Sequence, residues 1–263
     1  MSFFSHVFGW RTVLGVTGAV ALPLLLAGVV GGARGPAALE RADALVLEGE
    51  LDAALALYTD IEAQSWSDER AATAAWHAGS AAALAGADAQ AIAHLETFLA
   101  RWPGDPRAAS ASAQLGVLLA DSAPREAADH LVSAAELAPQ APSAADRMLQ
   151  AAALLEKSER TTAAWTLYER SVRSFPERAP EAWIAMARMR LEVGDPAAAQ
   201  ELYEKVLAEP SATELHDLAR LGLSIAQEDL GDFDAVLAEL HSLDLSEAQR
   251  EQRRERVMGR VRP

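Results

Sequence analysis

Histidines, cysteines and paired carboxylates are the side chains that most often form catalytic or metal sites. This sequence does not place them at the spacings typical of such sites. Its six histidines are widely spaced, at His6, His77, His94, His130, His216 and His241. They form neither His-x-His nor His-Glu-x-x-His, the spacings that bring two imidazoles to one metal ion. Cysteine is absent, which excludes thiol catalysis, disulfides and thiolate ligands. We therefore expect no metal site.

The other polar residues show no catalytic spacing either. Serine, aspartate and glutamate are plentiful, but no motif pairs a nucleophile with a base. Gly104-Asp105 and Gly86-Ala87-Asp88 read as turns, and no glycine-rich loop follows an apolar strand, so no phosphate cradle is predicted. We expect a protein that is not an enzyme and has no cofactor. An enzyme would need a pair of buried carboxylates in one pocket.

The elements that position these side chains are predicted to be helices. Hydrophobic residues make up 51% of the 263-residue chain but aromatic residues only 6%, so alanine and leucine carry the apolar share. These two residue types favour helices, and the 12 prolines divide the chain at intervals. The composition therefore predicts an all-α fold of short, closely packed helices.

The formal net charge of −15 is unevenly distributed. Residues 250–263 hold six arginines and two glutamates, so the preceding body is more acidic than the total suggests. Nucleic-acid binding requires a basic face that attracts phosphates. An acidic body argues against a nucleic-acid partner and favours solubility.

An apolar segment lies near the N-terminus. Residues 12–32 carry no charge, and 21 residues of helix are long enough to cross the hydrocarbon core of a bilayer. Phe3, Phe4 and Phe8 precede the segment and suit a membrane interface. We predict an N-terminal cap (1–11) and a transmembrane signal anchor (12–32). The alternative is a signal peptide cleaved after the small residues near Ala33.

The rest of the chain repeats. One alanine column recurs at intervals of 37, 36, 37 and 35 residues: Ala54, Ala91, Ala127, Ala164 and Ala199. A large side chain follows each alanine by four residues: Tyr58, Leu95, Leu131, Tyr168 and Tyr203. Small residues let two antiparallel helices approach closely, and the large residue fills the space beside them. Glycines such as Gly49, Gly86 and Gly194 end the first helix, and proline pairs such as Pro103/Pro106 end one helix and start the next at its first position.

These columns resemble the tetratricopeptide repeat. The fifth unit matches the pattern of that family best, with Trp183, Ala187, Gly194, Ala199, Tyr203 and Pro210. The stretch from Phe98 to Ala108 is similar to a joint found in tetratricopeptide proteins of the bacterial envelope. The resemblance implies a right-handed α-α superhelical solenoid of about six helical hairpins over 36–245. A C-terminal capping helix and basic tail would follow over 246–263, opened by a Ser246–Gln249 capping box.

The resemblance also implies a groove lined by the first helix of each hairpin. Its lining candidates are Asp43, Trp76, Ser80, Leu149, Ala153, Lys157, Ile184, Arg188 and Glu192. Lys157 is the only lysine in a first helix and the chain has no asparagine, so a clamp for a C-terminal carboxylate is not expected. The mixed lining suits an extended peptide or a partner helix. For Trp76 the alternative is packing between hairpins.

The basic tail, Arg250–Arg262, mixes arginine with Val257, Met258 and Val261. It suits contact with anionic lipid headgroups, an acidic polymer or the acidic body of the protein itself, and the alternative is a solvated terminal helix.

We expect a membrane-tethered scaffold or adaptor for protein–protein interaction in an envelope complex or in protein export and assembly. Its location would be the bacterial inner membrane, as a single-pass protein with the helical body in the periplasm. The alternatives are a secreted, soluble periplasmic peptide-binding protein and an accessory subunit of a larger membrane complex.

Overall fold

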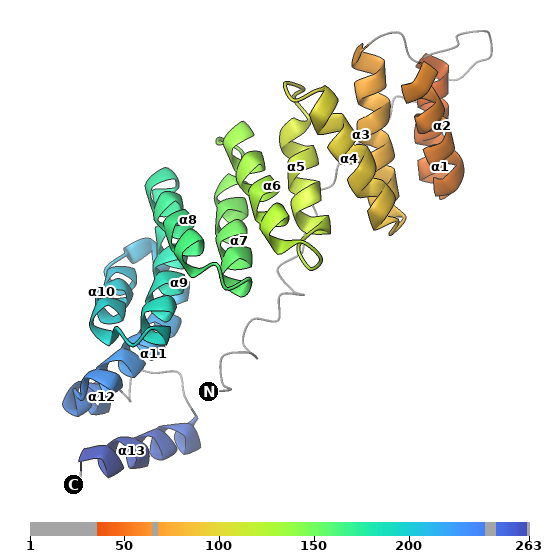
Figure 1. Ribbon diagram of the computed structural model, residues 1–263. Coiled ribbons are helices and arrows are strands. Elements are labelled where there is room, and N and C mark those ends of the chain that lie inside the picture. The colour runs from red at the N-terminus through yellow and green to blue at the C-terminus, as the bar shows by residue number, and fades with distance from the viewer. Residues whose placement is uncertain (1–35, 65–67, 240–245, 262–263) are drawn as a thin grey trace. The chain divides into compact units, whose positions relative to one another are not determined.

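The computed structural model describes residues 36–64, 68–239 and 246–261 (Figure 1). All regular structure in these ranges is helical, without a strand. The predicted N-terminal cap (1–11) and transmembrane segment (12–32) lie outside the described residues. Within the described ranges, no helix combines the length and the apolar character needed to cross a bilayer.

The described helices form six hairpins, each made of a first and a second helix. The hairpins are α1 (Pro36–Glu48) with α2 (Leu51–Gln64), α3 (Asp68–Leu84) with α4 (Asp88–Arg101), α5 (Ala108–Leu118) with α6 (Pro124–Leu137), α7 (Ala144–Lys157) with α8 (Thr161–Ser174), α9 (Ala179–Glu192) with α10 (Pro196–Leu207), and α11 (Thr213–Leu230) with α12 (Phe233–Glu239). A further helix, α13 (Glu247–Val261), follows. The expected all-helical class and repeated hairpins are confirmed for these residues.

Each helix packs mainly against the helices before and after it in the chain (Figure 1). The hairpins are therefore stacked in sequence order, and contacts between first helices, such as α3 with α5 and α9 with α11, are fewer. Such a stack buries each apolar face between neighbouring hairpins.

The predicted columns occupy the core. Ala54, Ala91, Ala127, Ala164 and Ala199 are all fully buried, and the large residues four positions later are buried as well. A Cβ atom on Gly79 would come within 2.6 Å of Leu95 Cγ, and one on Gly116 within 2.5 Å of Leu131 Cγ. The small residue and the large residue thus meet across each of these hairpins, as the sequence predicts.

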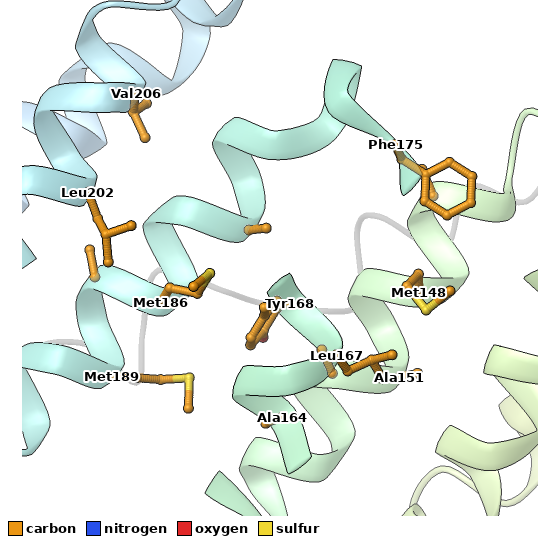
Figure 2. Packing of buried hydrophobic residues seen from close by; sticks show 14 of the residues in the cluster. Met148, Ala151, Ala164, Leu167, Tyr168, Phe175, Met186, Met189, Leu202 and Val206 are labelled. Atoms are coloured by element: carbon orange, nitrogen blue, oxygen red, sulfur yellow. The ribbon is translucent and has the colours of Figure 1, made fainter. Parts of the chain in front are cut away.

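The largest cluster of buried side chains runs from α6 to α11. Figure 2 shows large buried side chains of these hairpins, with Met148, Tyr168 and Met186 among them. Two smaller clusters lie within α1–α6 and consist largely of alanine. Burying one large apolar side chain contributes about 1.5–3 kcal/mol, so the larger side chains carry most of the packing energy.

Glycine ends the first helix in four hairpins. Gly49, Gly86, Gly194 and Gly231 have φ between +72° and +82°, the left-handed conformation that glycine adopts without strain. Glu159 takes the same conformation in the fourth hairpin, with φ +60°. An aspartate directly after the glycine caps the second helix in two hairpins: Asp195 accepts a hydrogen bond from the Ala198 amide, and Asp232 from the Ala235 amide, both at 3.2 Å.

The prediction for the second proline of each connecting pair is wrong in two cases. Pro106 and Pro142 lie one residue before the N-cap residues of α5 and α7 rather than at the first helical position. At the first of these joints Asp105 accepts a hydrogen bond from the Arg107 amide at 2.9 Å, which extends the turn past the proline. Pro180, in contrast, lies in the first turn of α9.

The C-terminal end departs from the repeat. The second helix of the sixth hairpin, α12, has only seven residues, and the fully buried Val236 stands where earlier hairpins have alanine. The predicted capping box opens α13: the Ser246 amide donates to Gln249 Oε1 at 2.9 Å, and the Gln249 amide donates to Ser246 Oγ at 3.3 Å.

The close approach at Gly79 leads to a stability prediction. Gly79→Ala places a methyl group against Leu95, which is fully buried and would have to shift. Overpacking costs about 1–3 kcal/mol, which exceeds the gain of up to about 1 kcal/mol from the better helix former. The free energy of unfolding in urea should therefore fall.

Gly104→Ala is the matched control because no atom lies within 4 Å of the added Cβ. A loss of stability for Gly104→Ala as large as that for Gly79→Ala would contradict this account of the hairpin core.

Candidate partner-binding surface

Polar contacts between successive hairpins fix the register of the first helices. His77 Nδ1 lies 2.7 Å from Asp43 Oδ1, which joins α3 to α1. Ser80 Oγ donates to Gln114 Oε1 at 3.2 Å, which joins α3 to α5. Each contact spans 34 residues, so Asp43 and Ser80 are equivalent positions of successive first helices.

Extending this register gives two rows of equivalent residues, which together we call the first-helix face. The first row is Asp43, Ser80, Val117, Ala153 and Arg188, and the second row, one helical turn later, is Leu47, Leu84, Asp121, Lys157 and Glu192. All ten residues are half-buried or exposed. Six of them are among the groove candidates predicted from the sequence.

Asp43 lies in a hydrogen-bonded cluster. It accepts from the Tyr58 hydroxyl at 2.5 Å and contacts His77 as described above. Burial raises the pKa of Asp43, but the hydrogen bonds from His77 and Tyr58 outweigh burial and hold the pKa below 3.8. Burial and the nearby Asp43 carboxylate raise the pKa of Tyr58. The cluster therefore joins the first two hairpins with an ionised carboxylate at its centre.

Trp76 packs inward. Its indole ring is partly buried against the cluster that includes Phe98 and Leu115 and makes an edge contact with the His77 ring at 5.1 Å between centroids. The guanidinium of Arg107 lies 5.8 Å from the Trp76 ring centroid. These contacts correspond to the packing alternative for Trp76. Leu149 and Ile184 are likewise half-buried against the largest cluster.

The predicted charged residues form pairs between hairpins. Lys157 Nζ lies 3.3 Å from Asp121 Oδ1, and Arg188 pairs with Glu156. The Tyr168 hydroxyl donates to Glu156 Oε2 at 3.1 Å. Glu192 lies exposed at the end of α9. The structure thus brings Lys157 and Arg188 to neighbouring carboxylates of the previous hairpin.

The two tyrosines beside this network, Tyr168 and Tyr203, have raised pKa values. Burial raises the pKa of Tyr203 to about 12, although the positive charge of Arg188 acts in the opposite direction. Burial also raises the pKa of Tyr168. Both phenols are therefore protonated at neutral pH, and neither is an activated nucleophile.

The cavities of the described residues are small and open. One, of about 310 Å³, is lined by Met148, Phe175 and Arg170, and its carboxylates Glu136 and Glu177 are exposed. Another, of about 210 Å³, lies beside Trp165 and Arg190, whose guanidinium stacks on the indole at 4.2 Å. Among the described residues, no three histidine, aspartate or glutamate side chains are grouped to hold a metal ion.

The basic tail contacts the protein itself. Arg256 Nη2 donates to Glu228 Oε2 of α11 at 2.6 Å, and Val257 is fully buried. The Glu228 side chain is only 4% exposed, so Arg256 supplies a positive charge to a buried carboxylate. This matches the expectation that the tail meets the acidic body, while contact with an anionic surface stays a prediction.

Three exposed apolar residues on the first-helix face were not predicted. Leu47, Leu84 and Val117 are 58%, 72% and 55% exposed. Leu47 and Leu84 each lie five residues after a small residue of the repeat, Ala42 and Gly79, so the register places both on the outside. The repeat columns alone therefore contain the signal that identifies them.

The fold has relatives among solved structures. No family model and no curated protein matches the sequence. A crystal structure of MamA protein is 18% identical with a TM-score of 0.50, covering 66% of this chain and 96% of that one. The structure of YrrB, described as a TPR protein with an unusual peptide-binding site, is 21% identical with a TM-score of 0.49, covering 69% and 88%. MamA from Desulfovibrio magneticus RS-1 is 17% identical with a TM-score of 0.46, covering 65% and 92%.

Similarity at this level of identity concerns the fold alone. The MamA likeness supports the interpretation of the hairpins as a tetratricopeptide-type array. It does not concern partners or location.

The lowered pKa of Asp43 predicts how stability depends on pH. Because the folded-state pKa lies below 3.8, the ionised carboxylate stabilises the fold fully above that pH, and this contribution is lost as the pH falls through the folded-state pKa. Asp43→Asn should therefore lower the free energy of unfolding in urea by on the order of 1 kcal/mol at about pH 5. The difference between the wild type and the variant should shrink below pH 3.8. A difference that stays constant down to about pH 2 would contradict the prediction.

Proposed function

We propose that this protein is a scaffold that holds other proteins on its first-helix face and is tethered to a membrane by residues 12–32. The proposal places the helical body in the periplasm of a bacterial envelope, where it takes part in the assembly of a complex or in protein export. The observation that carries it is the first-helix face itself, with exposed side chains at equivalent positions of five successive hairpins.

The arrangement of contacts supports the scaffold role. Each helix packs on its chain neighbours, so the second helices and the adjacent first helices satisfy the core. The first-helix face therefore keeps large exposed side chains such as Leu84 and Glu192. Repeat arrays of this kind offer a broad surface for a peptide or a partner helix.

Support for the tether comes from the sequence. Residues 12–32 are uncharged, and aromatic residues precede them, as in a membrane anchor. A cleaved signal peptide would instead release a soluble periplasmic protein that binds peptides. An accessory subunit of a larger membrane complex would keep the anchor but have one permanent partner.

The proposal includes no catalytic activity. Within the described part of the chain, the most buried carboxylate, Glu228, pairs with an arginine, and Asp43 is bound by tyrosine and histidine. A carboxylate engaged in this way serves structure better than proton transfer.

Cross-linking in native membranes tests the proposal. The full-length protein, expressed in a bacterial host with an intact envelope, is cross-linked and purified, and the attached proteins are identified by mass spectrometry. We expect envelope proteins to be attached to lysine or carboxylate positions of the first-helix face, and the protein to resist alkaline extraction of the membrane.

Intact mass separates the alternatives. A mature chain that begins near Ala33 would replace the anchor with a cleaved signal peptide. A single partner in fixed ratio would identify an accessory subunit. Recovery of no protein above an untagged control would overturn the scaffold role.

A further inference from the structure

The first-helix face differs in character along the chain. In the first three hairpins it presents Leu47, Leu84 and Val117, all more than half exposed. Scattered apolar residues are normal on a protein surface. Here, however, the three residues lie on the first helices of three successive hairpins, at equivalent positions or one helical turn apart. We call these three residues the apolar patch, and their recurrence on one face of successive first helices makes it a candidate interaction site.

The surroundings of these residues are acidic. Residues 36–137, which form the first three hairpins, contain 16 acidic and only five basic side chains. Glu48 and Glu50 follow Leu47, and Asp88 follows Leu84, and all three are exposed. The Asp121 side chain, on the second row beside Val117, is 97% exposed, although it pairs with Lys157 of the next hairpin.

Two of the five basic residues of these hairpins form ion pairs with carboxylates of the same hairpins or their connections. Arg101 Nη1 lies 2.9 Å from Glu62 Oε1, and Arg107 Nη2 lies 2.7 Å from Asp105 Oδ2. Excess carboxylates in this region therefore lack enough cations within the same hairpins to neutralise them. A partner with positive charge would be attracted to this surface.

The fourth and fifth hairpins contrast with this arrangement. Their positions on the two rows include Lys157, Arg188 and Glu192, and Arg188 already pairs with Glu156. Among the first five hairpins, the combination of exposed apolar residues on the two rows with surplus negative charge is thus a property of the first three.

We propose that the first-helix face of hairpins one to three binds a protein segment that is both apolar and basic, with leucine-like side chains at helical spacing and lysine or arginine between them. The apolar side chains cover Leu47, Leu84 and Val117, and the cations meet the surrounding carboxylates. The assignment rests on the proposed scaffold role and adds the chemistry of the partner. Anionic lipid and nucleic acid are disfavoured because both would be repelled by the same carboxylates.

Three labelled peptides of about 16 residues, or roughly four helical turns, test this assignment by fluorescence anisotropy. The first alternates leucine at positions three and four apart with lysine, the second replaces leucine by serine, and the third replaces lysine by glutamate. The leucine–lysine peptide should bind at least about tenfold more tightly than either other peptide. Its affinity should fall as salt is raised, because the carboxylates contribute.

Variants locate the site. Leu47→Ser with Leu84→Ser removes the two most exposed apolar side chains of the patch and should weaken binding of the leucine–lysine peptide about tenfold or more. Val193→Ser is the matched control, since Val193 is 64% exposed at the end of α9, outside the patch. Circular dichroism checks that all variants keep their helices.

Equal binding of the glutamate peptide, or an equal loss for Val193→Ser, would overturn the assignment. Failure of the scaffold role looks different, because no envelope protein would then be cross-linked in native membranes. The Leu47→Ser/Leu84→Ser variant separates the two proposals. If it no longer distinguishes the leucine–lysine peptide from the other two but still forms the native cross-links, the scaffold role stands and the apolar–basic partner is wrong.

Discussion

The structure depends on the close approach of two helices at positions that hold only glycine or alanine. Leu95 and Leu131 occupy the space that a Cβ on Gly79 or Gly116 would need, and the buried alanine column allows the same approach in every hairpin up to the fifth. Close approach makes each hairpin thin, so a single hairpin has little core of its own and must be covered by its neighbours. The sixth hairpin, with Val236 in the small position and a seven-residue second helix, is where this geometry ends and α13 takes over.

Stacking of this kind also explains the polar contacts. Side-chain pairs join one hairpin to the hairpin or helix that follows it in the chain. Examples are Asp43 with His77, Asp146 with Arg178, and Glu228 with Arg256. In each of these pairs the acidic residue belongs to the earlier element and the basic residue to the later one. An exposed pair such as Asp146 with Arg178 contributes only about 0–1 kcal/mol, so its main effect is on the register of neighbouring hairpins. That register aligns the first helices and so creates the first-helix face.

Much of the fold follows from the sequence because small and large residues recur at a fixed period. The helix class, the hairpins, the left-handed glycines and the Ser246 capping box were all predictable, since each depends on local spacing. The orientation of Trp76 stayed open, because an indole on a first helix can either line a groove or pack inward, as it does here against the cluster that includes Phe98 and beside the His77 ring. Pro106 lies two residues before the first helical position predicted for it because a side-chain turn at Asp105 delays the helix. The exposure of Leu84 could have been predicted from its place five residues after Gly79 in the repeat, a position that the predicted columns did not include.

The central claim is that partners bind the first helices and not the second. Site-specific photo-cross-linking tests it most directly, with a photoreactive phenylalanine analogue at position 84 on α3 or at position 137 on α6 of the full-length protein. Both native residues are exposed, Leu84 at 72% and Leu137 at 51%, so either replacement is tolerated. The account predicts that proteins in native membranes are captured from position 84 and not from position 137. Capture from position 137 alone would contradict it.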